Sequence, residues 1–359
     1  MALHRYRNAL AALAMASTAI VAAAGTAGAA VHNSSHAKAS TAKKLVFRKN
    51  GTPILTGTTI RIANSAGSAH IGDAHIYVME QALKQWGATT SMVNGSSNIA
   101  ELGVASGNED ICTSPVGNAL DLGLTAFGPN QTSVAYFLMT PKSITSLKQL
   151  KGLKYADDYG AGNVDFPLWA AAAKLGGFNM SQMTLVTTGA EANSYNQVLA
   201  GKVSAAWVDP STVAQAGPNF HTLATGAKVA PKYADSMMFA RPAWIAANPA
   251  TAEAIDLAWL ASAKTFNTNE GAWAADAYSY TAGTNTIATL RTAYSLLKSI
   301  GGFATEHNVF GRQAVAENVV IAKSLGILSN LGDRPLAQLV KTAPWDQAWA
   351  QYNAHKKAY

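Results

Sequence analysis

The sequence of 359 residues contains a single cysteine, Cys112. One thiol cannot form an internal disulfide, so noncovalent packing must hold the fold together. The residues from Asp110 to Thr113 are typical of the end of a strand. We therefore expect Cys112 to be a small, buried apolar side chain, with a functional thiol as the less favoured alternative.

Charged residues are also scarce, at 13% of the chain, whereas hydrophobic residues make up 49%. This composition excludes a disordered chain and supplies enough apolar material for two domains or one large one. The formal net charge is +7. Much of it lies in residues 30–49, which we interpret as a polar, basic tether, with contact to an anionic surface as the alternative. No basic stripe is interleaved with aromatic residues, so nucleic acid is not an expected partner.

Long apolar runs are missing beyond the N-terminus, so the mature part is not expected to span a membrane. The N-terminus itself has a positive start, with Arg5 and Arg7, and an alanine-rich apolar stretch from Ala9 to Ala24. Because Ala27-Gly28-Ala29 fits a cleavage site, we predict a signal peptide over residues 1–29, cut near Ala29. A retained membrane anchor is the alternative. No cysteine lies near this position, so a lipoprotein anchor is excluded, and we expect a protein exported to the periplasm or the cell surface.

Sequence motifs of familiar enzyme classes are absent as well. There is no G-x-S-x-G elbow, no H-E-x-x-H pair and no phosphate-binding loop. His70 and His75 are five residues apart and do not share a helical face, so they are poor metal co-ligands. We therefore expect no catalytic residues, no metal and no cofactor. An exported enzyme stays open as an alternative, because catalytic residues can be dispersed along a sequence.

What the sequence does contain is an alternation of short apolar strands and helices. Thr58–Ala63 alternates as a strand does, and Asp73–Trp86 has apolar residues at helical spacing before Gly87. Further strands are predicted at 89–93, 109–113, 133–139, 154–157, 183–187, 204–208, 222–225 and 237–240. Further helices are predicted at 99–106, 118–124, 143–150, 164–175, 193–200, 249–266, 268–282, 285–300, 311–325 and 336–340. This rhythm predicts an α/β fold with mostly parallel sheets.

Four segments resemble, in their order and spacing, segments of periplasmic-type binding proteins. They are Leu102–Ile111, Ser143–Tyr155, Val198–Trp207 and Phe239–Pro249. Gln149 and Ser204 depart from the family pattern, which usually has aspartate at both places. The most similar subgroup contains the nitrate, sulfonate and taurine binding proteins of ABC importers, together with the thiamine-pyrimidine binding proteins.

The resemblance implies a two-lobed, type II-like periplasmic-binding-protein fold, in which each lobe is a mixed, mostly parallel sheet flanked by helices. The first lobe would hold residues 50–139 and 228–359, and the second would hold residues 140–227. Crossings near 138–142 and 224–238 would form the hinge. It also implies a monomeric solute-binding component of an ABC importer, with a membrane permease as partner and a small sulfonate-, nitrate- or taurine-like molecule as ligand. A ligand sensor on the same fold is an alternative.

Ligands of α/β sheets bind at the carboxyl ends of strands, beside helix N-termini. Loops at such ends contain the candidate ligand-binding residues, which are Ser65, Ala66, Gly67, Thr113, Ser114, Tyr159, Gly160, Gly162, Asn163, Thr188, Trp207 and Asp209. Glycines let the backbone approach a ligand closely, although an ordinary turn is an equal interpretation of Gly160 and Gly162. Asp209 suits a ligand amine, or it caps a helix that begins at Pro210. Trp207 suits either the ligand site or the core.

Overall fold

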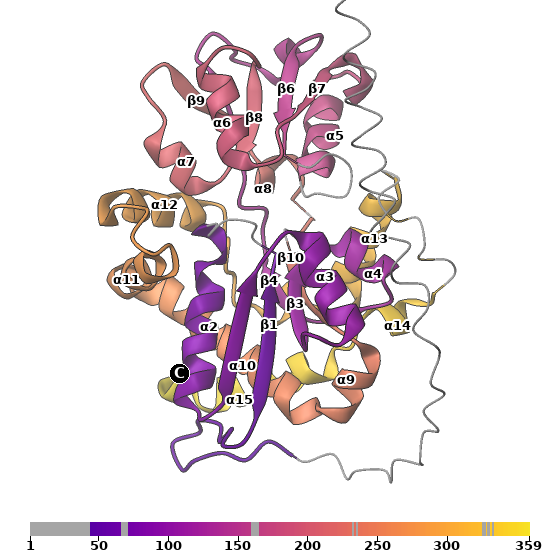
Figure 1. The fold of residues 1–359 in the computed structure, drawn as a ribbon, viewed down its shortest axis with the longest axis vertical. Helices are drawn as coiled ribbons and strands as arrows, with labels where there is room; N and C mark the ends of the chain where they lie inside the picture. Colours follow the sequence, from indigo (N-terminus) through magenta and orange to yellow (C-terminus); the bar gives the residue numbers. More distant parts are fainter. Residues whose placement is uncertain are drawn as a thin grey trace, which may run out of the picture. The chain divides into compact units, whose positions relative to one another are not determined.

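The protein is described here by a computed structural model, which covers residues 44–65, 71–158, 165–231, 233–234, 236–324, 328, 331 and 334–359. These residues form an α/β fold with two five-stranded mixed sheets, each flanked by helices (Figure 1). The predicted fold class is confirmed. The expected signal peptide and most of the expected tether lie outside the described residues.

The first sheet has the strand order β2-β1-β3-β10-β4. Its strands are β1 (Thr59–Asn64), β2 (Thr89–Asn94), β3 (Ile111–Ser114), β4 (Thr125–Gln131) and β10 (Ser236–Ala240). β1 runs parallel to β2 and β3, whereas β10 runs antiparallel to β3 and β4. The helical segments between these strands are η2 (Ile71–Asp73), α2 (Ala74–Gln85), α3 (Ser97–Ser106) and α4 (Val116–Asp121).

The second sheet has the order β7-β6-β8-β5-β9. Its strands are β5 (Phe137–Pro141), β6 (Lys154–Asp157), β7 (Thr184–Thr187), β8 (Ala205–Val208) and β9 (Phe220–Thr225). β6 is parallel to β7 and β8, and β5 is antiparallel to β8 and β9. Its helical segments are η3 (Leu147–Leu150), α5 (Asp165–Leu175), η4 (Met180–Gln182), α6 (Glu191–Leu199), α7 (Pro210–Gln215) and α8 (Gly226–Val229).

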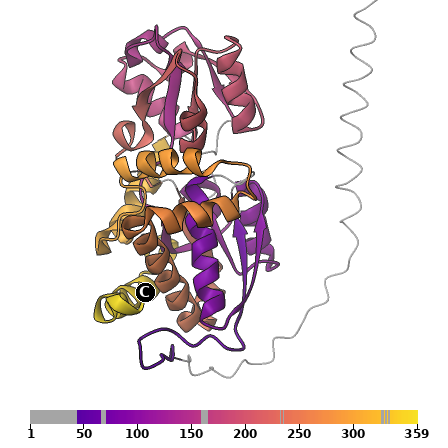
Figure 2. The same ribbon diagram turned by 90° about the vertical axis from the view of Figure 1, so that its left-hand side faces the viewer.

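The chain returns to the first sheet through β10 and continues in helices. These are α9 (Pro242–Ala247), α10 (Pro249–Thr268), α11 (Glu270–Tyr280), α12 (Ile287–Ser299), η5 (His307–Val309), α13 (Arg312–Ser324), α14 (Leu336–Leu339), α15 (Ala343–Ala354) and η6 (Lys356–Ala358). α10 packs against both α2 and α15, and α11 also packs against α2 (Figure 2). No helix in the described ranges is long and apolar enough to cross a membrane.

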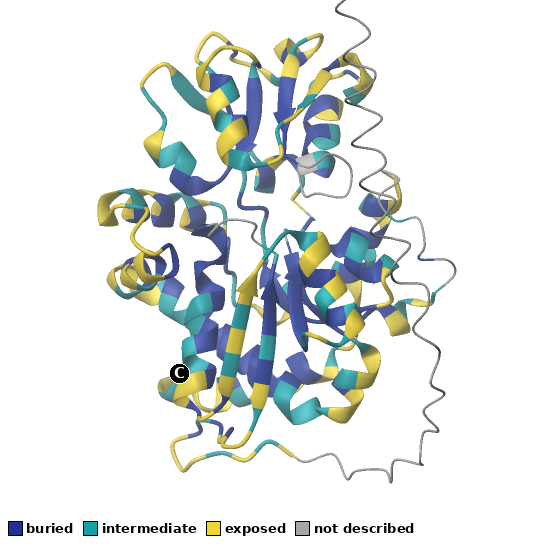
Figure 3. Ribbon diagram, in the orientation of Figure 1, coloured by how far each residue is buried: buried dark blue, intermediate teal, exposed yellow. Residues whose placement is uncertain are grey.

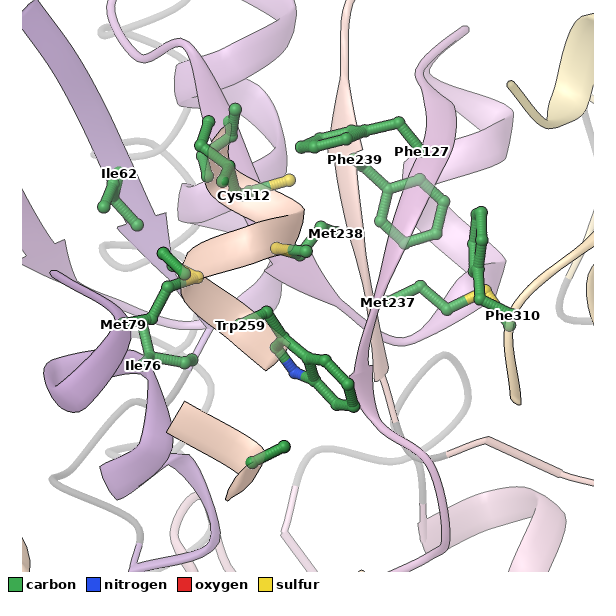
Figure 4. Packing of buried hydrophobic residues seen from close by; sticks show 14 of the residues in the cluster. Ile62, Ile76, Met79, Cys112, Phe127, Met237, Met238, Phe239, Trp259 and Phe310 are labelled. Atoms are coloured by element: carbon green, nitrogen blue, oxygen red, sulfur yellow. The ribbon is translucent and has the colours of Figure 1, made fainter. Parts of the chain in front are cut away.

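The largest apolar cluster joins the first sheet to these C-terminal helices. Met238 and Phe239 of β10, Phe127 of β4 and Trp259 of α10 meet in it (Figure 4). β3, β4 and β10 of the first sheet and β5, β6 and β8 of the second are largely buried, whereas the edge strands β2 and β7 are mostly exposed (Figure 3). Cys112 is fully buried, as predicted. The second sheet has two smaller clusters of its own.

Both crossings between the sheets join corresponding edges. The chain leaves the first sheet at Gln131, where β4 ends, and enters the second at Phe137, where β5 begins; it leaves at Thr225 and re-enters at Ser236. Because β5 and β10 are antiparallel to their neighbours, each begins where the other strands of its sheet end. We call these the first and second carboxyl edges. The two crossings therefore connect one carboxyl edge to the other.

One predicted boundary needs correction. Residues 133–139 were expected to form a strand of the first lobe, but β5 begins at Phe137, and Leu138 pairs with both Trp207 and Ala224 of the second sheet. The crossing therefore precedes this strand. The reason is that β4, a strand that the sequence analysis did not predict, already fills the edge of the first sheet. The division into two lobes is otherwise unchanged as a prediction.

Candidate functional site

Buried amides and hydroxyls connect the strand ends along the first carboxyl edge. Asn64, at the end of β1, donates from Nδ2 to Asn94 Oδ1 at 3.1 Å and to the Tyr280 hydroxyl at 2.9 Å. Its Oδ1 accepts from Thr113 Oγ1 at 2.8 Å, and Thr113 Oγ1 lies 3.4 Å from the backbone nitrogen of Ser65. Two predicted residues, Ser65 and Thr113, therefore lie together at this edge.

Ser114, the last residue of β3, contacts a buried acid. Its hydroxyl donates to the Glu101 carboxyl of α3, which is only 1% exposed. Burial raises the pKa of Glu101 to about 8, against the hydrogen bond from Ser114, which lowers it. Ser114 was predicted as a site residue. Glu101 was not, because an acid within an amphipathic helix is usually exposed.

A second polar group lies where β4 ends and β10 begins. Gln131 donates from Nε2 to Asp73 Oδ1 at 3.0 Å, and Asn130 donates from Nδ2 to Ser236 Oγ at 2.6 Å. His75 Nε2 lies 2.6 Å from Asn130 Oδ1, and burial lowers the pKa of this imidazole. None of these residues was predicted as part of the site, and Asn130 and Gln131 were missed because the strand that they end was not predicted.

The second carboxyl edge is acidic. Asp158 follows β6 directly and is 4% exposed. Its Oδ1 accepts from Ser194 Oγ at 2.5 Å, and Ser194 Oγ lies 2.6 Å from Thr188 Oγ1. Burial raises the pKa of Asp158 to about 7, and the charges of Glu191 and Asp157 raise it further, while the hydrogen bonds from Ser194 and Thr188 oppose the shift. Thr188, a predicted site residue, thus lies at this edge beside an acid that was not predicted.

Asp209 connects the two edges. Its Oδ1 caps α7 by accepting from the Thr212 backbone nitrogen at 2.8 Å, and it also accepts from Ser211 Oγ at 2.7 Å. Its Oδ2 accepts from the backbone nitrogen of Ile71 in η2, at 3.3 Å. The backbone nitrogen of Asp209 donates to Glu191 Oε1 at 2.8 Å. The predicted helix cap is confirmed, and the same carboxylate also contacts η2, which follows β1 of the first sheet.

Trp207 belongs to the core rather than to the ligand site, which were the two interpretations of its position. Its side chain is fully buried, and its ring packs edge-on against Trp169 of α5, with centroids 5.9 Å apart. The side chain therefore lies between the second sheet and α5 rather than at the carboxyl edge. Six predicted residues lie outside the described residues: Ala66, Gly67, Tyr159, Gly160, Gly162 and Asn163.

Some chemistry can be set aside for the described part of the chain. Within it, no group of three or more His, Cys, Asp and Glu side chains is arranged to hold a metal ion. The thiol of Cys112 is buried, which raises its pKa well above the ordinary value, and the charge of Glu101 adds to this shift. Cys112 is therefore no nucleophile in the folded protein.

Two crossings connect the carboxyl edge of one sheet to that of the other. Solved structures share this fold. Among the structures that share this fold are solute-binding components of importers. The zinc-bound ligand-binding component of an ABC-type import system from Staphylococcus aureus superposes with a TM-score of 0.65 at 12% identity, covering 81% of this chain and 99% of that one.

Two further structures with this fold bind anions. The periplasmic aliphatic sulphonate binding protein SsuA from Escherichia coli gives a TM-score of 0.62 at 13% identity, over 80% of this chain and 93% of its own. The periplasmic nitrate-binding protein NrtA from Synechocystis gives 0.62 at 12% identity, over 84% and 90%. No family model and no curated protein matches the sequence. At sequence identities this low, the similarity shows a shared fold and nothing about the ligand.

Proposed function

We propose that this protein is the extracytoplasmic solute-binding component of an ABC importer, and that it holds a small polar molecule between its carboxyl edges. The observation that carries the proposal is the pairing of these edges. Both crossings join them, and the hydrogen bond from Ile71 to Asp209 spans them. In α/β folds this is where ligands bind.

The proposal is one of binding without turnover. The edge hydroxyls donate to side-chain oxygens, as Ser114 does to Glu101 and Ser194 does to Asp158. His75, by contrast, is engaged with Asn130 and the backbone oxygen of Gly72, so it is not placed as a general base for these hydroxyls. An exported enzyme and a ligand sensor are the competing functions.

Export and delivery complete the proposed role. A signal peptide over residues 1–29 and a tether over residues 30–49 would release a monomeric protein outside the cytoplasm. It would pass its solute to a membrane permease. The resemblance favours small anionic or zwitterionic molecules, such as sulfonates, nitrate or taurine, as the first solutes to test.

The test is thermal unfolding of the full chain against sulfonates, taurine, nitrate, bicarbonate, pyrimidines and simple amines. A solute that binds only the folded state stabilises it by about 2.7 kcal/mol at 100 times its Kd. For a chain of this size that corresponds to a rise in Tm of roughly a few degrees. We expect at least one such rise, with the solute recovered unchanged.

Each competing function predicts a different result. Chemical conversion of the bound compound during incubation would contradict pure binding and favour an enzyme. Binding of a solute, combined with failure to stimulate the ATPase of the cognate permease in vesicles, would favour a sensor. The absence of any shift across the panel would contradict the proposed function.

A further inference from the structure

Hydrogen-bond polarity at the two carboxyl edges constrains the chemistry of the solute. On the first edge, the single hydrogen of the Thr113 hydroxyl is donated to Asn64 Oδ1, and that of Ser114 is donated to Glu101. A serine or threonine hydroxyl has one hydrogen. These two hydroxyls can therefore only accept further hydrogen bonds, and Thr113 Oγ1 already accepts from the Ser65 backbone nitrogen.

The second edge has the same polarity. Ser194 donates its hydroxyl hydrogen to Asp158 Oδ1, and Ser211 donates to Asp209 Oδ1. Thr212 Oγ1 donates to Glu191 Oε1 at 2.9 Å. The hydroxyl hydrogens are again directed to carboxylates of the protein. Among the described residues, these hydroxyls at the second edge can therefore only accept further hydrogen bonds.

Gln131 supplies an independent observation on the first edge. It is 3% exposed, and its Oε1 has no hydrogen-bond donor within reach in the described part of the chain. Its Nε2 donates to Asp73, which fixes the amide orientation, because the reversed amide would place two acceptor oxygens against each other. A buried acceptor without a donor is costly, so a donor from a bound molecule would stabilise it.

The acidic residues form a continuous series across the two edges. Gln131 contacts Asp73 in η2, and the same short helix donates from Ile71 to Asp209. Asp209 in turn donates its backbone N–H to Glu191, whose charge raises the pKa of Asp158. An ammonium group placed here would donate charge-assisted hydrogen bonds to carboxylates such as Asp73.

Two arginines of the first lobe lie at the other end of its sheet. Arg61 pairs with Asp110, which precedes β3, at 2.7 Å. Arg241 follows β10 and donates to the backbone oxygens of Val104 and Glu109. These guanidinium groups are therefore committed at the amino ends of the parallel strands. Among the described side chains, Tyr280 does offer a donor at the first carboxyl edge, because its hydroxyl accepts from Asn64 and keeps its own hydrogen.

We infer that the solute carries an ammonium group, which Asp73, Asp209 and Gln131 Oε1 receive between the two carboxyl edges. This inference rests on the proposed binding function. A protonated amine has three donors and no acceptor, which matches an edge of acceptors. A purely anionic sulfonate or nitrate presents acceptors to acceptors and like charge to like charge.

Matched pairs of small molecules test the inference. Taurine and isethionate share a sulfonate and a two-carbon chain but differ in carrying an ammonium or a hydroxyl. Ethanolamine and ethylene glycol differ in the same way without the sulfonate, and nitrate is the simple anion. Binding of each to the full chain is measured by thermal shift and calorimetry. We expect binding by at least one of the two amines and at least tenfold weaker binding by its hydroxyl counterpart, because the hydroxyl lacks the charge that strengthens hydrogen bonds to carboxylates.

A charge variant completes the experiment. Asp209→Asn keeps an acceptor for the cap of α7 but removes the carboxylate charge. We expect about a tenfold or greater loss of amine affinity in this variant. Glu270→Gln, at an exposed acid 3.8 Å from Arg291, is the matched control and should bind as the wild type does.

The outcomes separate the two proposals. Binding of isethionate or nitrate with no binding of the amines would overturn the ammonium inference and leave the proposed function intact. Equal losses of affinity in Asp209→Asn and Glu270→Gln would also overturn it. Failure of every compound to bind would contradict both the inference and the binding function.

Discussion

At the scale of single residues, Glu101 is the acid behind the first carboxyl edge. Its carboxyl is buried, one oxygen accepts from Ser114, and the other has no partner among the described residues. Burial raises its pKa from an ordinary value of 4.5 to about 8. Because the folded state binds this proton more tightly than the unfolded state, the contribution of Glu101 to stability is complete below about pH 4.5 and is lost as the pH rises through about 8.

Glu101→Gln should therefore reduce the dependence of stability on pH. Each tenfold change in proton affinity corresponds to about 1.4 kcal/mol, so the wild type is expected to lose a few kcal/mol of unfolding free energy between about pH 5 and pH 9. The variant should lose less. It should not become fully flat, since burial also raises the pKa of Asp158 and of Asp256.

Urea denaturation at several pH values measures this dependence. Glu270→Gln provides the control, since its side chain is exposed and should leave the wild-type profile unchanged. If Glu101→Gln and the wild type lose the same free energy over this range, then Glu101 is ionised throughout and the account given for it is wrong.

At the scale of the elements, Asp209 holds the first turn of α7. Its Oδ1 accepts from the Thr212 backbone nitrogen, and Pro210 occupies the first helical turn. Asp209→Ala removes the cap and should lower the unfolding free energy by about 1–2 kcal/mol. Asp209→Asn retains a capping oxygen and should lower it by about half a kcal/mol or less. Urea denaturation distinguishes the two, and equal losses would mean that charge rather than capping is what stabilises α7.

Most elements follow from local sequence patterns, and the exceptions have physical causes. β4 was not predicted because Gly128-Pro129-Asn130 is typical of a turn. The strand tolerates Pro129 because it lies at the edge of its sheet, beside β10, with register shifts in the pairing. Gly128 is required there, since a Cβ would lie 1.9 Å from Asp256 Oδ1. This contact with α10 cannot be deduced from spacing.

Of the candidate site, the residues at strand ends could be predicted from the sequence, whereas residues from distant segments could not. Thr113, Ser114, Thr188 and Asp209 lie at carboxyl edges because the end of each parallel strand can be located from its own pattern. Residues brought in from distant segments could not be found in this way. Tyr280, for example, reaches Asn64 across 216 positions of sequence.

At the scale of the whole described molecule, two side-chain hydrogen bonds link the two edges, beside the packing of α7 on α12. Ile71 donates to Asp209, and Gln215 Nε2 donates to Asn285 Oδ1 at 3.3 Å, where α7 packs on α12. A hydrogen bond adds little net free energy to the closed arrangement, because water replaces it when the two edges separate. We therefore expect the lobes to separate readily in the absence of solute. A solute that contacts both edges should shift the population toward the closed arrangement.

The expected separation of the two lobes can be measured with dyes on introduced cysteines, since the native cysteine is buried. Because Cys112 is fully buried, cysteines introduced at exposed positions can be labelled selectively. Leu102 in α3 is 55% exposed and Leu185 in β7 is 38% exposed, so a donor and an acceptor dye at these positions report on the separation of the lobes. We expect a change in energy-transfer efficiency on addition of the solute that gives the largest thermal shift.

A matched pair within one lobe separates closure from local effects on the dyes. Leu122 follows α4 in the first lobe and is 40% exposed, so labels at Leu102 and Leu122 should show no change when the same solute is added. A constant signal from the interlobe pair, in a sample where calorimetry shows saturation, would mean that the edges are held together before the solute arrives. The solute would then have to enter without separation of the two sheets, and the two crossing segments would be rigid rather than a hinge.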